Sequence, residues 1–119
     1  MSKEERIAAR LIAAIDALIP ASCTVAIHPG RLDFAFEGRW EVSMGLGIDG
    51  RPPEVLAFCA LSTVQDAIVR SVRQPWPPGN GPTDLPIPEA VVREGRLVAW
   101  FGAEACPAVA IPPIDLTTV

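Results

Sequence analysis

The chain has 119 residues, of which 50% are hydrophobic and 20% are charged, and its formal net charge is −4. This length fits a single domain over residues 1–119, and the ten basic residues do not cluster as phosphate neutralisation requires, so we expect no nucleic-acid partner. No apolar run approaches the roughly 18 residues of a membrane helix, so we expect no membrane span and a location in the cytoplasm or within a phage or secretion assembly.

The first predicted element is a helix over residues 3–19. Apolar residues recur at three- and four-residue spacing, which places them on one stripe of a helix. Ser2, three residues before Glu5, forms the pattern of a capping box, and Pro20 cannot continue the helix. The stripe consists of Ile7, Leu11, Ile15 and Leu18, with Ile12 and Ile19 beside it.

Three alternating runs follow and predict a three-stranded antiparallel meander. Pro29-Gly30 has the composition of a type II turn, and Gly38-Arg39 that of a tight hairpin connection. Alternation places one set of apolar residues from each run on a common face. These sets are Cys23, Val25 and Ile27; Leu32, Phe34 and Phe36; and Trp40, Val42, Met44, Leu46 and Ile48.

A long helix is predicted over residues 53–73, with a proline in its first turn, where the missing N–H has no helical partner. Its first half, 54–63, is apolar nearly all round and includes Phe58 and Leu61. A helix with a solvent face shows charges on that face. We therefore expect this half to be covered by the sheet and by something else, and the chain to self-associate or to bind a protein partner.

Six prolines between Pro75 and Pro88 predict a crossing loop, because proline removes a backbone donor and suits neither a helix interior nor a central strand. Short strands are expected over residues 90–93, 96–101 and 108–111. The fold class is therefore α+β with two layers. Its element order resembles that of type III secretion chaperones, a resemblance that implies topology and a small acidic dimer, and no activity.

The residues that carry chemistry are sparse. His28 is the one histidine and has no cysteine at ligand spacing, so we expect neither metal nor cofactor. Cys23, Cys59 and Cys106 are predicted to be buried free thiols. The carboxylates Asp33, Glu37 and Glu41 alternate with apolar residues, which favours a solvated face; a recognition face is the alternative.

The three tryptophans offer the clearest candidates for binding. Trp40 and Trp100 lie in predicted strands, where packing on the sheet is the simpler interpretation. Trp76 stands between two prolines and is interpreted either as folded back onto the domain or as an anchor for a partner, since tryptophan is enriched at interface hot spots. The candidate partner-binding residues are Trp76, Phe58, Leu61 and Trp40.

Gln65-Asp66, Pro75-Trp76-Pro77, Gly95 and Trp100 together resemble a small family of actinobacterial proteins in which a helix ending in Gln-Asp and Pro-Trp-Pro precedes a strand bearing a tryptophan. The resemblance covers about residues 55–102. Relatives carry Cys and His after Pro-Trp-Pro and a further Cys after the tryptophan. Residues 78–84 and 101–103 of this chain contain none of these, so the resemblance implies no metal role and no activity for it.

Two classes of function follow. The preferred one is a non-enzymatic protein-binding or assembly module acting through an apolar surface, such as an adaptor, a chaperone-like protein, an inhibitor or a component of a phage or secretion assembly. The alternative is a small-molecule binder or an enzyme that uses carboxylates near Trp40 or Trp76. A deep pocket with two carboxylates of raised pKa favours the alternative, and a flat apolar patch favours the first.

Overall fold

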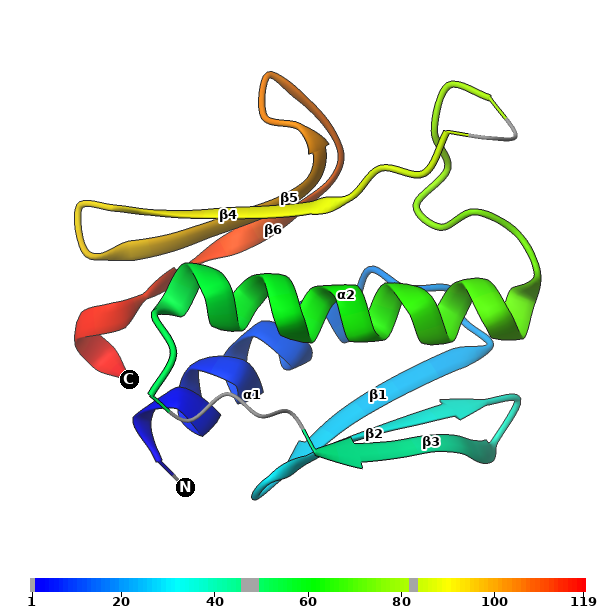
Figure 1. Cartoon of the computed structure of the whole chain (residues 1–119), viewed down its shortest axis with the longest axis horizontal. Coiled ribbons are helices and arrows are strands. Elements are labelled where there is room, and N and C mark those ends of the chain that lie inside the picture. Colours follow the sequence, from blue (N-terminus) through cyan, green and yellow to red (C-terminus); the bar gives the residue numbers. More distant parts are fainter. Residues whose placement is uncertain (1, 46–49, 82–83) are drawn as a thin grey trace.

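The computed structural model describes residues 2–45, 50–81 and 84–119 and has the predicted α+β element order (Figure 1). The strands form two antiparallel sheets, β1-β2-β3 and β4-β5-β6, named here the N-terminal and the C-terminal sheet. The elements are α1 (Lys3–Asp16), β1 (Cys23–His28), β2 (Arg31–Phe36), β3 (Arg39–Gly45), α2 (Pro53–Val72), β4 (Pro88–Arg93), β5 (Arg96–Ala103), β6 (Cys106–Asp115) and the 3₁₀ helix η1 (Leu116–Thr118).

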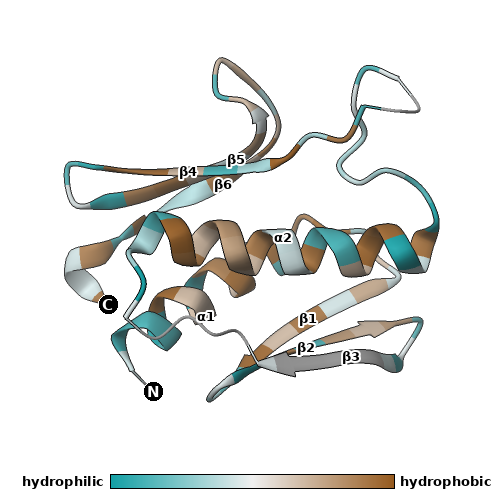
Figure 2. Ribbon diagram, viewed as in Figure 1, coloured by the Kyte–Doolittle hydropathy of each residue, from teal (hydrophilic) through white to brown (hydrophobic). Residues whose placement is uncertain are grey.

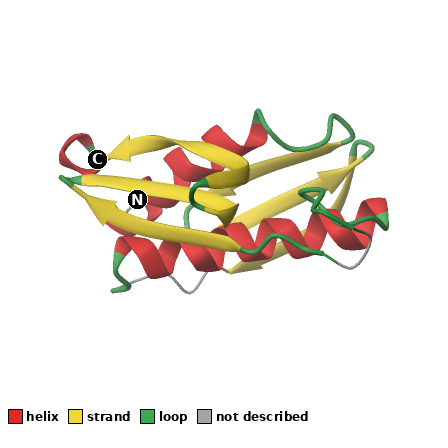
Figure 3. Cartoon of the chain, turned by 90° about the horizontal axis from the view of Figure 1, so that it is seen from above, coloured by secondary structure: helices red, strands yellow, loops and turns green. Residues whose placement is uncertain are grey.

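The two helices pack on each other between the two sheets (Figures 1 and 3). α2 packs against β4 and β5 of the C-terminal sheet and against β2 of the N-terminal sheet, while α1 packs against β1 and β6. Apolar side chains from both helices and both sheets therefore form one buried cluster. The long helix α2 lies at its centre, and brown apolar colour covers much of it in Figure 2.

α1 begins as predicted and ends earlier than predicted. The Ser2 hydroxyl accepts a hydrogen bond from the Glu5 N–H, and the Glu5 carboxylate accepts one from the Ser2 N–H, which completes the capping box. The helix ends at Asp16, after which the Leu18 and Ile19 amides both donate to the Ile15 carbonyl. This turn buries Ile19 and leaves Leu18 exposed, so Leu18 does not belong to the buried stripe.

A β-bulge in the N-terminal sheet changes the face on which Trp40 lies. β3 pairs with β2 in regular register up to Phe34↔Val42. Regular pairing would then place Glu41 opposite Ala35, but Trp40 pairs with Ala35 and Glu41 is the extra residue of the bulge. Because one extra residue reverses the alternation, Trp40 shares the face of Ala35 and not that of Phe34. The prediction that places Trp40 on the face of Phe34 is therefore wrong, and the side chains of Val42 and Met44 lie outside the described part of the chain. The predicted strand residues Leu46 and Ile48 lie outside the described residues.

α2 follows the prediction closely, beginning at Pro53 and ending at Val72. Arg73 caps the helix in the left-handed conformation (φ 58°), and its N–H donates to the Val69 carbonyl. The first half is not covered all round, however. Val55 and Phe58 are 38% and 49% exposed, because α1 and the two sheets cover only the other faces of the helix.

The sequence predicts no membrane span, but α2 is long and apolar enough to cross a bilayer. By length and composition α2 is the one described helix that meets the requirement for crossing a bilayer. The central helix of a domain core meets the same requirement, and α2 occupies that position in this fold.

The proline-rich segment between α2 and β4 is held by one buried amide. Gln65 on α2 is 4% exposed. Its side-chain Nε2 donates to the carbonyl of Trp76, 3.2 Å away, and to the carbonyl of Pro86, 2.6 Å away. The two acceptors lie near the two ends of the segment, so a single side chain on α2 fixes both its exit from the helix and its entry into β4.

Trp76 is folded back onto the domain. Its side chain is 8% exposed and meets the ring of Phe101 on β5 edge to face, with centroids 5.4 Å apart and planes at 70°. The interpretation of Trp76 as folded back onto the chain therefore describes this structure. Trp100 on β5 is also buried, and its indole N–H donates to the Gly102 carbonyl.

The last strand is longer than predicted, because its prolines do not end it. β6 spans Cys106–Asp115 and includes Pro107, Pro112 and Pro113. It lies at one edge of the C-terminal sheet and pairs only with β5. An edge strand tolerates proline because half of its N–H groups face away from the ladder. Pro112 and Pro113 lie between Ile111 and Ile114, where the register with β5 shifts between Leu97 and Ala99.

Replacing Trp76 with alanine tests the role of this ring in the core. We expect Trp76→Ala to lower the free energy of unfolding by about 3 to 5 kcal/mol, because it removes a large buried aromatic side chain. Trp40→Ala is the matched control, and we expect it to cost about 1 kcal/mol or less because Trp40 is 67% exposed. Denaturant unfolding of both variants measures the difference; a loss of less than about 1 kcal/mol for Trp76→Ala contradicts the assignment.

Candidate functional site

The structure separates the four candidate partner-binding residues. Trp76 and Leu61 are buried in the core, so neither is available to a partner in this conformation. Phe58 is 49% exposed on α2, and Trp40 is 67% exposed on the N-terminal sheet. The two exposed residues lie on different elements and do not form one site.

The first candidate surface is the exposed side of α2. Val55 and Phe58 are three residues apart, which places them on the same side of the helix, and both are exposed. We name this pair the α2 patch. Among the described residues, the other exposed large apolar side chains, apart from Trp40, lie elsewhere on the chain and are Leu18, Leu85, Ile87 and Val92.

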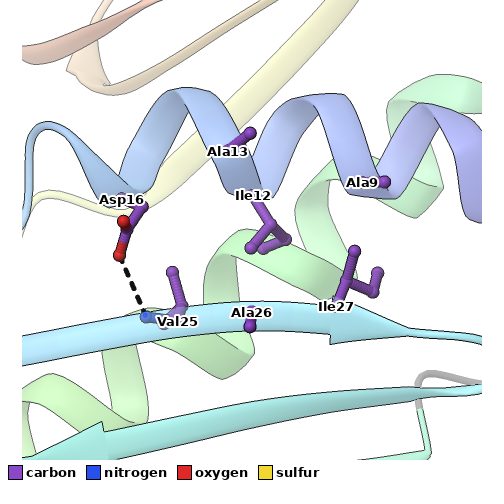
Figure 4. A pocket seen from close by; sticks show the side chains of 7 residues that line it. All are labelled: Ala9, Ile12, Ala13, Asp16, Val25, Ala26 and Ile27. Atoms are coloured by element: carbon purple, nitrogen blue, oxygen red, sulfur yellow. Dashed lines mark hydrogen bonds between the residues drawn. The ribbon is translucent and has the colours of Figure 1, made fainter.

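The second candidate surface is a groove between α1 and β1 (Figure 4). It has a volume of about 370 Å³ and is lined mainly by small and aliphatic side chains. β1 is an edge strand, and in its register with β2 the N–H of Val25 points away from the sheet. The lining residues are Ala9, Ile12, Ala13, Asp16, Val25, Ala26 and Ile27.

Asp16 closes part of this open edge. Its carboxylate accepts a hydrogen bond from the Val25 N–H at 3.0 Å, seen as the dashed line in Figure 4. Asp16 is the last residue of α1, where a negative charge faces the negative end of the helix dipole, and no basic residue lies in that turn. The hydrogen bond to β1 offsets this unfavourable interaction between the Asp16 charge and the helix dipole. Because the Val25 N–H already donates to Asp16, it is not available to pair edge strand β1 with a strand of another molecule.

The third candidate surface is a hollow of about 340 Å³ on the outward face of the N-terminal sheet. We name it the Trp40 hollow; His28, Arg31, Asp33 and Trp40 line it. Asp33 is 5% exposed, which contradicts the expectation of a solvated carboxylate. The Arg31 Nε donates to its two oxygens at 3.1 and 3.2 Å, and the His28 Nε2 lies 3.2 Å from Oδ2.

The two described carboxylates of the expected solvated or recognition face, Asp33 and Glu37, do not share one exposed face. Asp33 is buried and contacts Arg31 and His28, whereas Glu37 lies in the β2–β3 turn with a positive φ of 53°. The side chain of Glu41 lies outside the described part of the chain. The β-bulge supplies the physical reason, because it places Trp40 on the face where the carboxylates were expected to meet solvent.

The thiols and carboxylates offer no assembled reactive group among the described residues. Cys23 is buried, and burial raises the pKa of its thiol. Cys59 is half-buried and Cys106 is exposed, so the expectation of three buried thiols holds for Cys23 alone. No group of three potential metal ligands occurs in residues 2–45, 50–81 and 84–119.

A further hollow of about 480 Å³ lies beside Cys106, between β6 and the proline-rich segment. Asp84 shapes the neighbouring turn by accepting the Asn80 N–H at 2.8 Å. Each of the three hollows is lined by one carboxylate, namely Asp16, Asp33 or Asp84. None of the three therefore has the pair of carboxylates expected for acid–base catalysis.

No protein-family model, no curated protein and no solved structure matches this chain.

The bond between Asp16 and β1 is testable at one amide. We expect the Val25 N–H to be protected from hydrogen exchange in the wild type, although it lies on a sheet edge, and to lose that protection in Asp16→Ala, which has no acceptor. Asp16→Asn is the control, because it keeps a side-chain oxygen and should keep the protection. Equal exchange at Val25 in the wild type and Asp16→Ala, measured by NMR, contradicts the assignment.

Proposed function

We propose that this chain is a non-enzymatic protein-binding or assembly module that contacts its partner through the α2 patch. The observation that supports this proposal most directly is the exposure of Val55 and Phe58 on a helix whose other faces lie in the core. The composition agrees, since half of the residues are hydrophobic.

The energetics favour a role as an anchor. Complete burial of a phenylalanine or valine side chain stabilises a contact by about 1.5 to 3 kcal/mol relative to full exposure, and both side chains are only partly exposed. The patch therefore accounts for the centre of an interface, and surrounding residues must supply the rest. Because α2 is held in the core, the patch is presented on a rigid element and loses little conformational entropy on binding.

The simplest partner is a second copy of the chain, which agrees with the expected homo-oligomer. A chaperone-like adaptor, an inhibitor or a component of a phage or secretion assembly uses the same kind of surface on a different protein. The alternative class, a small-molecule binder near Trp40, is favoured by a separate observation: the charged Trp40 hollow.

Association is tested by light scattering over a concentration series. We expect the average mass to rise above that of one chain in the wild type, and to stay at one chain in Phe58→Ser, because the substitution removes the aromatic anchor. Leu18→Ser is the matched control, since Leu18 is also exposed (41%) but lies outside the α2 patch. It should associate as the wild type does.

Unfolding measurements separate association from folding. Phe58→Ser should change the free energy of unfolding of the single chain by no more than about 1 kcal/mol. A wild type that stays a single chain throughout, together with no protein whose binding depends on Phe58, contradicts the proposal.

A further inference from the structure

We propose that the Trp40 hollow binds a carboxylate attached to a flat apolar group, with Arg31 holding the carboxylate and Trp40 packing against the apolar group. The hollow lies on the outward face of the N-terminal sheet, away from α2. This inference therefore does not depend on the α2 patch or on association.

Asp33 positions the arginine. The buried carboxylate accepts two bonds from the Arg31 Nε, which fixes the plane of the guanidinium group. The Arg31 side chain nevertheless remains 56% exposed. In the described part of the chain no hydrogen bond involves its two terminal nitrogens. These nitrogens form the planar fork that suits a carboxylate with two parallel hydrogen bonds.

The terminal nitrogens of Arg31 in this hollow are hydrogen-bond donors only. Asp33 is already engaged by Arg31 and by His28, whose Nε2 lies 3.2 Å from its Oδ2. His28 and Arg31 pair across the strands beside the Pro29-Gly30 turn, so both side chains are held on one hairpin. A ligand that supplies acceptor atoms therefore fits this hollow better than a neutral hydroxyl compound, which also needs acceptors from the protein.

Trp40 supplies the apolar part of the site. The β-bulge turns it onto the face of Asp33, and 67% of it is exposed. The ring–ring contact among the described residues joins Trp76 to Phe101, not Trp40 to another ring. Exposing this much of an indole beside a positioned arginine has no function in the core, whereas it suits stacking of a flat ligand group.

Charge favours a carboxylate over a phosphate. The hollow contains the buried negative charge of Asp33, and the chain as a whole carries a net charge of −4. A phosphate monoester brings nearly two negative charges, whereas a carboxylate brings one and matches the planar fork of Arg31. The inferred ligand class is therefore an aromatic or flat apolar monocarboxylate, either a free small molecule or the C-terminal residue of a peptide.

The test is an NMR titration that follows the indole N–H of Trp40 and the Nε–H of Arg31. Phenylacetate is the probe, phenylacetamide is its neutral counterpart, and acetate lacks the ring. We expect saturable shifts of both signals with phenylacetate and at least about tenfold weaker binding of the other two, because each lacks one of the two contacts.

Substitutions of Arg31 and Trp40 test whether phenylacetate binding depends on these two side chains. Arg31→Lys keeps a charge beside Asp33 but removes the fork, and Trp40→Leu removes the indole; each should weaken phenylacetate at least about tenfold. Arg39→Gln is the control, since Arg39 lies on the same sheet outside the hollow, and it should bind as the wild type does. Chemical-shift maps of the remaining amides confirm that each variant is folded.

An acetylated dipeptide ending in phenylalanine distinguishes the two sources of the carboxylate. Tighter binding of this peptide than of phenylacetate, lost when its C-terminus is amidated, indicates a peptide ligand; weaker binding indicates a small molecule. Equal shifts with phenylacetate and phenylacetamide, or phenylacetate binding unchanged in Arg31→Lys, overturns the proposal. The wild-type ligand series gives this answer even if a variant fails to fold.

Discussion

The buried side-chain amide of Gln65 connects α2 to the proline-rich segment that leads into the C-terminal sheet. Its two hydrogen bonds, to the carbonyls of Trp76 and Pro86, close a segment whose prolines cannot form a ladder or a helix of their own. With both ends of that segment fixed, the Trp76 ring reaches Phe101 and the C-terminal sheet packs on α2. In this chain the glutamine satisfies two backbone carbonyls that would otherwise be buried without a donor.

The two proposed binding surfaces lie on elements that pack in the core, α2 and the N-terminal sheet. The α2 patch lies on the one side of the helix that neither α1 nor the sheets cover, and the Trp40 hollow lies on the outward face of the N-terminal sheet. They differ in chemistry. The first is apolar and suits a protein surface, whereas the second combines an oriented arginine with an exposed indole and suits a small anionic group. The two proposals therefore place protein association and ligand binding on separate faces of the chain.

Much of the fold follows from local patterns in the sequence. The spacing of Ile7, Leu11 and Ile15, the capping box at Ser2 and the prolines at both ends of α2 predict the helices closely, because each signal acts within a few residues. The position of Trp40 could not be predicted in this way, because the bulge arises from pairing between β2 and β3, and the burial of Asp33 depends on the same pairing. β6 extends past its prolines because it is an edge strand, which the sequence does not reveal. The candidate residues Phe58 and Trp40 are exposed as a contact surface requires, whereas the burial of Leu61 depends on how the helices and sheets pack around α2.

The central claim is that Gln65 couples α2 to the C-terminal sheet, and hydrogen exchange in Gln65→Leu tests it most directly. This substitution keeps the size of the side chain but leaves the carbonyls of Trp76 and Pro86 without their donor; Gln74→Leu, at an exposed position just beyond α2, is the control. We expect amides of β4 and β5 to lose protection in Gln65→Leu while those of β1 and β2 keep it, and Gln74→Leu to change neither sheet. An equal loss of protection in both sheets, or no loss in β4 and β5, would contradict a coupling through Gln65.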